Sequence, residues 1–161
     1  MKKGLRAKLN MKNFNYDLDY KNTLFKPNDS RYRIGRGEQG VLLVRPYTDR
    51  ICKYWRFKTL EEAEMSAQTI FNIFLEYRNS KDFVGMDMCR KFLEMGFTRS
   101  RRYANHRDGK KYNKDGTIIP QEKDSLTCEK AKCARVHKEF RDMVMKDPIY
   151  EKMRKYWRAN E

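Results

Sequence analysis

Between Gly96 and Tyr112 the chain gathers basic, aromatic and amide side chains, with Asp108 as the one acid among them. Arginine can hold a phosphate through two parallel hydrogen bonds, tyrosine can stack on an unpaired base, and an amide can recognise a base edge. The segment, GFTRSRRYANHRDGKKY, therefore predicts a surface that binds the phosphate backbone of a nucleic acid. The residues that we expect to contact it here are Arg99, Arg101, Arg102, Tyr103, Asn105, His106, Arg107, Lys110, Lys111 and Tyr112.

Spacing supports a shared surface for part of this cluster. Arg99 and Arg102 are three residues apart, so on a helix they would lie on one face, with Tyr103 beside them. The alternative is a solvated basic face whose charges pair within the molecule, with Glu94 or Asp108 as partners. The whole-chain balance favours binding, because 37 Lys and Arg residues against 22 Asp and Glu give a formal net charge of +15.

A second candidate is the glycine-rich segment from Gly35 to Gly40, whose letters match a dinucleotide-binding loop. Such a loop needs a helix after it, so that the helix N-terminus meets the pyrophosphate. Here an apolar run that predicts a strand follows instead, and Glu38 would repel a phosphate. We therefore expect a turn that presents Arg36 and Gln39 and can hold an anion through its backbone amides. The phosphate contacts expected outside the main cluster are Arg36 and Arg56.

A metal-dependent enzyme acting on nucleic acid or nucleotides is the first alternative function. It would need several acids at one place, and the set that the sequence offers is Glu38, Asp87 and His106, which nothing in the sequence brings together. Cys133 and His137 are four residues apart on a predicted helix, but two ligands do not make a structural zinc site. Buried thiols explain the cysteines more simply. We expect no metal and no cofactor, and a binding protein is favoured over an enzyme.

Composition indicates an intracellular, folded chain. With 161 residues, 13% of them aromatic, the chain suits one domain with a substantial core. It contains no apolar run long enough to cross a membrane. The cysteines are scattered without a CxxC pair, as in a protein kept reduced in the cytoplasm. Residues 1–13 are basic and lack the apolar stretch of a signal peptide, so they predict a mobile arm, either a solubilising tail or a nucleic-acid-binding arm.

The elements that must position these residues are expected to be a small sheet followed by helices. Residues 14–20 alternate between apolar and polar, residues 41–44 form a short β-branched run, and residues 51–57 suit a further strand. Pro, Asn and Asp residues between them predict turns. We therefore predict a single α+β domain over residues 14–161, with a small antiparallel sheet in its first third packed by four or five helices.

Local signals predict where the helices begin and end. Thr59 and Glu62 form a capping box, Gly96 suits the C-terminal end of the second helix, and Thr98 could cap a short helix that carries the arginines. The letters NKDG after Tyr112 predict a hairpin. The expected helix starts are Thr59, Phe83, Thr98, Ser125 and Asp147.

Several long strings in the chain resemble the family catalogued as domain of unknown function 4385. They are RYRIGRGEQGVLLVRPY, WRFKT, FVGMDMCRKFLEMGFTRSRRYANH and GKKY, and the likeness covers the chain from Phe14 to the start of the C-terminal helices. Similar proteins occur in bacteria, fungi and large tailed phages. The resemblance implies a stand-alone intracellular domain and no catalytic residues, since the family has no assigned activity. A phage origin suggests a second alternative, an interaction protein that binds an acidic host protein; the oligomeric state stays open.

Overall fold

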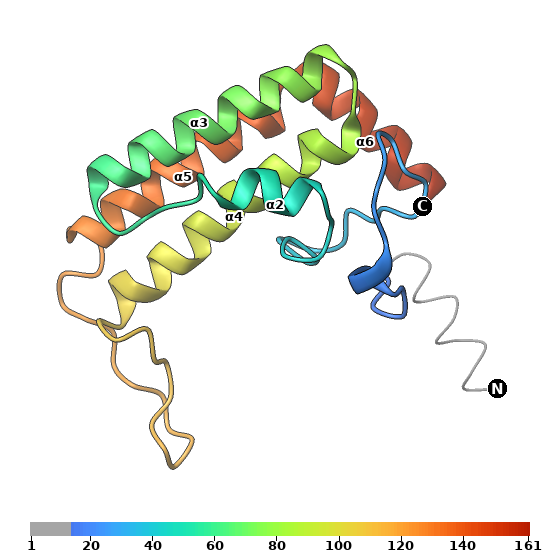
Figure 1. Cartoon of the computed structure of the whole chain (residues 1–161). Coiled ribbons are helices and arrows are strands. Elements are labelled where there is room, and N and C mark those ends of the chain that lie inside the picture. Colours follow the sequence, from blue (N-terminus) through green and yellow to red (C-terminus); the bar gives the residue numbers. More distant parts are fainter. Residues whose placement is uncertain (1–13) are drawn as a thin grey trace.

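The computed structural model describes residues 14–161, and the predicted basic arm at residues 1–13 lies outside them. Helix α4 is central, because it packs against α2, α3, α5 and α6, while α3 and α6 also contact α5 (Figure 1). The elements, in chain order, are the short 3₁₀ helix η1 (Tyr20–Asn22), α2 (Tyr47–Cys52), α3 (Leu60–Asn79), α4 (Phe83–Asn105), α5 (Glu129–Lys146) and α6 (Pro148–Asn160).

The predicted antiparallel sheet is wrong, and the fold is helical rather than α+β. Residues 14–161 contain five α-helices and no strand. The pairing found there is an isolated antiparallel bridge between Tyr112 and Ile118, far from the first third of the chain. Five helices agree with the predicted four or five, but α2 takes the place of part of a predicted strand and the helix expected at Thr98 is part of α4. Residues 14–161 hold no sheet for the helices to cover.

The apolar run at residues 41–44 forms consecutive turns instead of a strand. Val41 and Val44 are buried three residues apart, whereas the leucines between them are exposed. The hydroxyl of Thr48 accepts a hydrogen bond from the Val44 amide at 3.0 Å and donates one to the Val41 carbonyl at 2.8 Å. A side chain thus forms the hydrogen bonds to these backbone groups that a neighbouring strand would have formed.

The other two predicted strands are replaced by helix and turns. Tyr47 and Ile51 are both buried, one turn apart in α2, so the start of the 51–57 segment belongs to a helix. Near the N-terminal end, Phe14 and Tyr20 stack with their ring centroids 5.4 Å apart. Tyr16, between them, is 65% exposed, so the alternating residues do not share one buried face.

Three predicted helix starts, at Thr59, Phe83 and Asp147, are confirmed, and one is shifted. The Thr59 hydroxyl accepts a hydrogen bond from the Glu62 amide at 3.1 Å at the start of α3. The Asp147 carboxylate accepts from the first free amides of α6, where Pro148 is tolerated because its missing N–H would have no partner. Helix α5 starts at Glu129 rather than Ser125, since turns occupy the residues between.

Helix α4 continues through the glycine that was expected to end it. Gly96 lies inside the helix, and a Cβ at this position would come within 2.1 Å of Cδ2 of His137 on α5. The glycine is therefore required for the close approach of two helices, not for a left-handed end. Thr98 does not cap a new helix; its hydroxyl donates to the Glu38 carboxylate at 2.8 Å. One 23-residue helix thus carries the arginines on its last turns.

Candidate nucleic-acid interface

The last turns of α4 are covered along two lines, with an exposed strip between them. On one side, the Phe57 ring lies 6.3 Å from that of Tyr103; on the other, the glycine turn is bonded to α4 through Thr98. With 3.6 residues per turn, Arg99 and Arg102 fall between these two lines. Both are exposed, and neither forms an ion pair within residues 14–161. We call Arg99 and Arg102 the basic strip.

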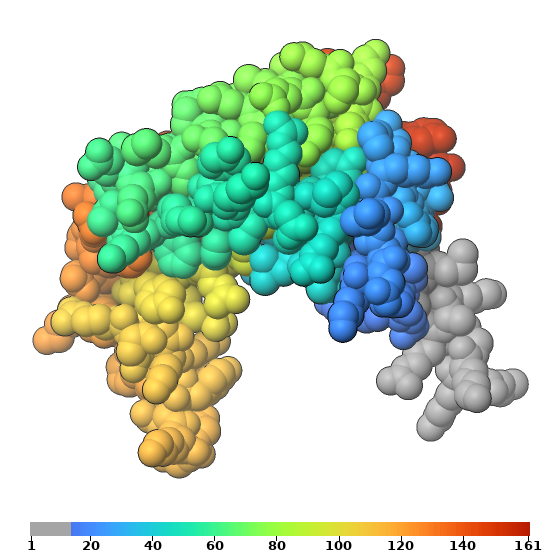
Figure 2. Space-filling model, in the orientation of Figure 1, coloured from blue at the N-terminus to red at the C-terminus, as the bar shows by residue number. Residues whose placement is uncertain are grey.

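The basic strip belongs to the part of α4 that borders a hollow in the molecular surface. In Figure 2 the end of α4, coloured yellow, and the orange loop after it form one wall of this hollow. The blue segment near the N-terminal end of the described chain forms the opposite wall, and the cyan segment that contains α2 covers the space between. The last turns of α4, which carry the basic strip, therefore form part of a concave face rather than a flat one.

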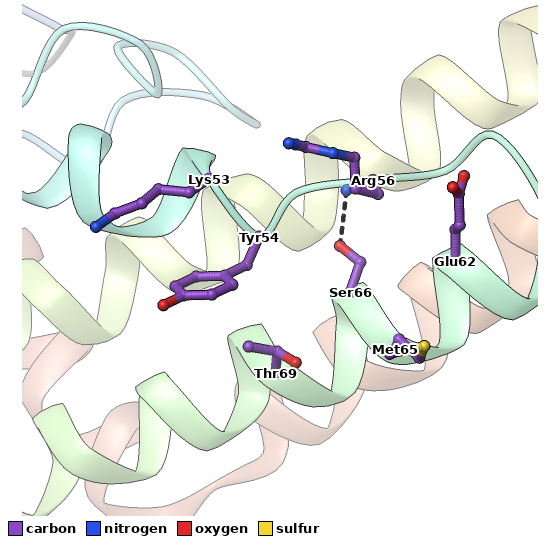
Figure 3. A pocket seen from close by; sticks show the side chains of 7 residues that line it. All are labelled: Lys53, Tyr54, Arg56, Glu62, Met65, Ser66 and Thr69. Carbon is purple, nitrogen blue, oxygen red and sulfur yellow. Dashed lines mark hydrogen bonds between the residues drawn. The ribbon is translucent and has the colours of Figure 1, made fainter.

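Arg56 lies in the extended segment that connects α2 to α3, beside a shallow pocket of about 230 Å³. Its backbone amide donates to the Ser66 hydroxyl at 2.8 Å, which fixes the segment to α3 (Figure 3). The Arg56 side chain points away from α3, and one of its Nη atoms donates to the Trp55 carbonyl at 2.7 Å. Arg56 is exposed and has no carboxylate partner among the described residues. The pocket is lined by Lys53, Tyr54, Arg56, Glu62, Met65, Ser66 and Thr69.

The glycine turn presents carbonyl groups to cations. Three of its carbonyls accept hydrogen bonds from basic side chains, of which Arg90 and Lys91 are buried and Arg158 is exposed. These bonds run from Arg158 to Gly35 at 2.8 Å, from Arg90 to Gly37 at 2.8 Å and from Lys91 to Gln39 at 2.7 Å. The turn is therefore held in place by positively charged side chains. The chain after it forms further turns rather than the helix that a dinucleotide site requires.

Two amides of this turn are used within the turn itself. The Arg36 amide donates to the Gln39 side chain at 2.7 Å, and the Gln39 amide donates to the Arg36 carbonyl at 3.1 Å. These two amides are not open to an anion, contrary to our expectation. The Arg36 side chain is exposed. What the turn offers a polyanion is this guanidinium, on a loop bonded to α4 beside the basic strip.

A buried charge cluster at the start of α4 supports the same turn. The Asp87 carboxylate accepts hydrogen bonds from Tyr32, from Tyr150 at 2.7 Å and from Arg90 at 2.6 Å. Burial would raise the pKa of Asp87, but the positive charges of Arg90 and Lys91 hold it well below its usual range. Burial lowers the pKa of Lys91 to about 7, against the opposing pull of Asp87. The sequence carried a signal that we did not use: three charged residues at helical spacing within an otherwise apolar stretch.

Three predicted contacts lie inside the fold instead of on the strip. The Arg101 guanidinium donates to the Ser125 carbonyl at 2.9 Å and to Oδ1 of Asn105 at 2.5 Å. These two residues thus attach the end of α4 to the loop before α5. His106 is only 5% exposed, and its Nδ1 has no hydrogen-bond partner within the described part of the chain. His106 is therefore buried, whereas Arg101 and Asn105 are half-buried and bonded within the protein.

The remaining predicted contacts lie on the loop after α4, which projects from the molecule (Figure 1). The Arg107 side chain is 80% exposed and stays 3.9 Å from the Glu122 carboxylate, a weak surface pair. Lys110 and Lys111 are exposed, and the Lys111 ammonium lies 5.6 Å from the Tyr112 ring centroid. The predicted hairpin is present in short form, held by the single bridge at Tyr112. These residues extend the basic strip along one wall of the hollow.

The comparison with family models gives a match over residues 15–160, to a family described as a domain of unknown function, number 4385. The chain belongs to this family. The resemblance drawn from the sequence strings is therefore confirmed over nearly the whole chain. The comparisons with curated proteins and with solved structures found no match. Membership of the 4385 family assigns no activity to the chain.

In this member of the 4385 family, the three residues proposed for a metal-dependent enzyme are separated. Asp87 and His106 are 19 positions apart along α4 and its cap, which corresponds to about 28 Å. Glu38 is bonded to Thr98, between them. No group of three or more His, Cys, Asp or Glu residues in the described part of the chain is arranged to hold a metal ion. The structure therefore does not assemble the set that this alternative needs.

Cys133 and His137 lie on the same buried side of α5, as their spacing predicted. The Nδ1 atom of His137 is 3.1 Å from the Cys133 carbonyl oxygen, and burial lowers the pKa of the imidazole. The side chains of Cys133 and His137 are buried, and the thiols of Cys128 and Cys133 form no disulfide.

No helix of residues 14–161 has the length and apolar character needed to span a bilayer.

Proposed function

We propose that this protein binds nucleic acid, DNA in the first instance, through the basic strip of α4 and the lysines of the loop after it. The observation that supports the proposal most is that Arg99 and Arg102 are exposed, adjacent and without a carboxylate partner in residues 14–161. Arg36 and Arg56 lie on the two segments that border the strip. A phosphate backbone would gain several ion pairs there at little desolvation cost.

The distribution of charge supports the same surface. Residues 98–112 contain six bases and one acid, whereas α3 contains four acids and one base. A polyanion approaching the molecule is attracted to the end of α4 and repelled by the outer side of α3. The asymmetry therefore orients the nucleic acid before any contact forms.

Aromatic side chains next to the bases favour single strands or distorted ends over intact duplex. Tyr103 is 38% exposed beside the strip, and Tyr112 is 56% exposed on the loop. A tyrosine can stack on an unpaired base but not on one inside a duplex. The phosphate contacts would therefore supply most of the affinity, and the two tyrosines the preference for unpaired bases.

A salt titration of DNA binding tests the proposal. If about five phosphates are neutralised, the log–log slope of the association constant against salt is about −4.5 on duplex and about −3.5 on single strands. Fluorescence anisotropy of labelled oligonucleotides with the full chain measures both. The double variant Arg99→Ala/Arg102→Ala should make the slope shallower by about 2. The matched control Lys132→Ala/Lys138→Ala removes two exposed bases of α5 and should leave the slope unchanged. A flat salt response would refute nucleic-acid binding.

We also propose a cytoplasmic location, in the host cytoplasm where the protein is phage-borne. All four cysteines are free thiols, as is usual in a reducing compartment. Fractionation of cells that express the tagged chain tests this, and recovery outside the cytoplasm would contradict it.

A further inference from the structure

A groove of about 830 Å³ lies along α6, near the start of α4 and away from the basic strip. One wall is α6, and the other is formed by the turns at Asn28 and Lys81. This volume is in the range of specific ligand sites. The α6 residues that line it are Pro148, Ile149, Lys152, Met153, Tyr156 and Trp157.

The apolar floor of the groove is held rigidly from below. The Trp157 ring stacks on Phe83 with centroids 5.0 Å apart, and its indole N–H donates to the Tyr32 carbonyl at 3.0 Å. Ile149 and Met153 pack against the core with their inner sides. Tyr156 is 69% exposed and has no such support. A partner therefore meets a preformed apolar surface, which lowers the entropy cost of binding.

The charges around the groove have one sign. Lys81 and Lys152 line it from its two walls, and no carboxylate does. Neither lysine forms an ion pair within residues 14–161. The turn that carries Lys81 is fixed, because the Asn28 side chain donates to the Lys81 carbonyl at 2.9 Å and accepts from the Phe83 amide at 2.8 Å.

We propose that this groove docks an acidic amphipathic helix of a partner protein. Ile149, Met153 and Tyr156 recur at positions i, i+4 and i+7, so the apolar wall extends for about two helical turns. That length suits a partner helix that inserts apolar side chains at i, i+3 or i+4, and i+7. Glu or Asp residues on the flanks of that helix would pair with Lys81 and Lys152. The site is independent of the proposed DNA surface.

Charge argues against two occupants from this chain itself. Its N-terminal residues 2–12 carry five bases and no acid, so they do not complement a basic groove. Two copies that paired groove to groove would bring Lys152 close to its own equivalent. A nucleic acid would gain stacking on Tyr156, but Ile149 and Met153 offer it no base-specific contact. An acidic partner with an apolar face uses both the floor and the rim.

Peptide selection on the full chain tests the proposal. The probe is a phage-displayed library of random peptides, and the variant Trp55→Phe leaves Trp157 as the single fluorescent indole. We expect the selected peptides to combine acidic residues with apolar residues at the spacing given above and to change the Trp157 emission. Their affinity should fall at least tenfold in Lys81→Glu/Lys152→Glu and in Tyr156→Ala. It should be unchanged in the matched control Lys132→Glu/Lys138→Glu.

Several outcomes would overturn the proposal. These are a selection without enrichment, peptides without acidic residues, and peptide affinities that the groove variants leave unchanged. The proposal also fails if single-stranded DNA or vesicles of phosphatidylserine and phosphatidylcholine compete for the groove with the same lysine dependence. It fails as well if sedimentation shows self-association that Lys152→Glu abolishes. The salt slope of DNA binding in Lys81→Glu/Lys152→Glu separates the two proposals, because it should stay at the wild-type value whether or not peptides bind.

Discussion

The two halves of α4 use the same kinds of charged residue in opposite ways. In the first half, Asp87, Arg90 and Lys91 are buried, and every one of them has partners inside the protein. In the second half, Arg99 and Arg102 are exposed and have no carboxylate partner in the described chain. The difference lies in what packs against the helix: the glycine turn and α6 cover its start, and a hollow borders its end. Packing, not residue type, decides which charges hold the fold and which can bind a ligand.

The largest effect is expected in the buried half. Asp87→Ala leaves the Arg90 guanidinium buried without its anion and removes the acceptor of two tyrosines. Loss of one member of a buried ion pair costs about 3–5 kcal/mol of unfolding free energy. Urea denaturation followed by circular dichroism measures it, with Glu64→Ala on the exposed side of α3 as control, expected within about 0.5 kcal/mol of wild type. If Asp87→Ala were as mild as the control, the cluster would not hold the fold.

The junction between the halves supplies the next test. Gly96→Ala places a methyl group against the His137 ring, and we expect a loss of about 1–3 kcal/mol, despite the gain of about 1 kcal/mol in helix propensity. Thermal and urea unfolding measure the loss. The double variant Gly96→Ala/His137→Ala should recover part of it, because the clash partner is gone. A loss that His137→Ala does not relieve would show that the two helices do not approach at this glycine.

The pH dependence of stability reports on Lys91. Its pKa is lowered in the folded state from an ordinary value of 10.5 to about 7. Between these values the unfolded chain binds a proton that the folded chain does not, so stability rises as pH rises. We expect a gain of about 1–2 kcal/mol between about pH 7 and pH 8.5. Above that range the cysteine thiols oppose the gain, because burial raises the pKa of Cys89.

The variant Lys91→Met provides the comparison for this gain. It keeps the length and apolar stem of the side chain but has no group to titrate. Urea midpoints at several pH values should show a rise for wild type and no comparable rise for Lys91→Met. Equal slopes would mean that Lys91 keeps its proton over the whole range, and that its hydrogen bonds to the Arg33 and Gln39 carbonyls outweigh its burial.

The sequence predicted those parts of the fold that depend on interactions between residues close together in the chain. The N-cap bond of Thr59 and the Asp-Pro start of α6 act within one helical turn, so they were predictable. The turns at residues 41–44 were not predictable, because a short apolar run fits a strand or a turn equally well. What decided between them was the Thr48 hydroxyl, which satisfies the backbone that a sheet would have used. Gly96 was misjudged because its reason for being glycine lies on another helix.

For the candidate site, composition suggested a region but not the roles of its individual residues. The density of bases from Arg99 to Lys111 singled out the exposed end of α4. Nothing local indicated that Arg101 would be bonded to Ser125, because the loop folds back over more than twenty residues. Residue type can thus suggest a basic surface, whereas membership of that surface depends on long-range packing.

The neighbours Arg101 and Arg102 allow the finest test of the difference between structural and binding charge. Arg102→Ala should leave stability within about 0.5 kcal/mol of wild type. It should also weaken DNA binding and make the salt slope shallower by about 1. Arg101→Ala removes two hydrogen bonds and should lower the unfolding free energy by about 1–2 kcal/mol, with the slope unchanged.

Each variant is measured by urea unfolding and by a salt titration of oligonucleotide binding. Arg101→Ala should change the unfolding free energy and leave the salt slope unchanged, whereas Arg102→Ala should do the reverse. The residues have the same charge and adjoin in sequence, so each is the control for the other. Equal loss of DNA affinity in both variants would mean that net charge alone governs binding. The basic strip would then have no particular part in it, and the separation between the two halves of α4 would concern folding only.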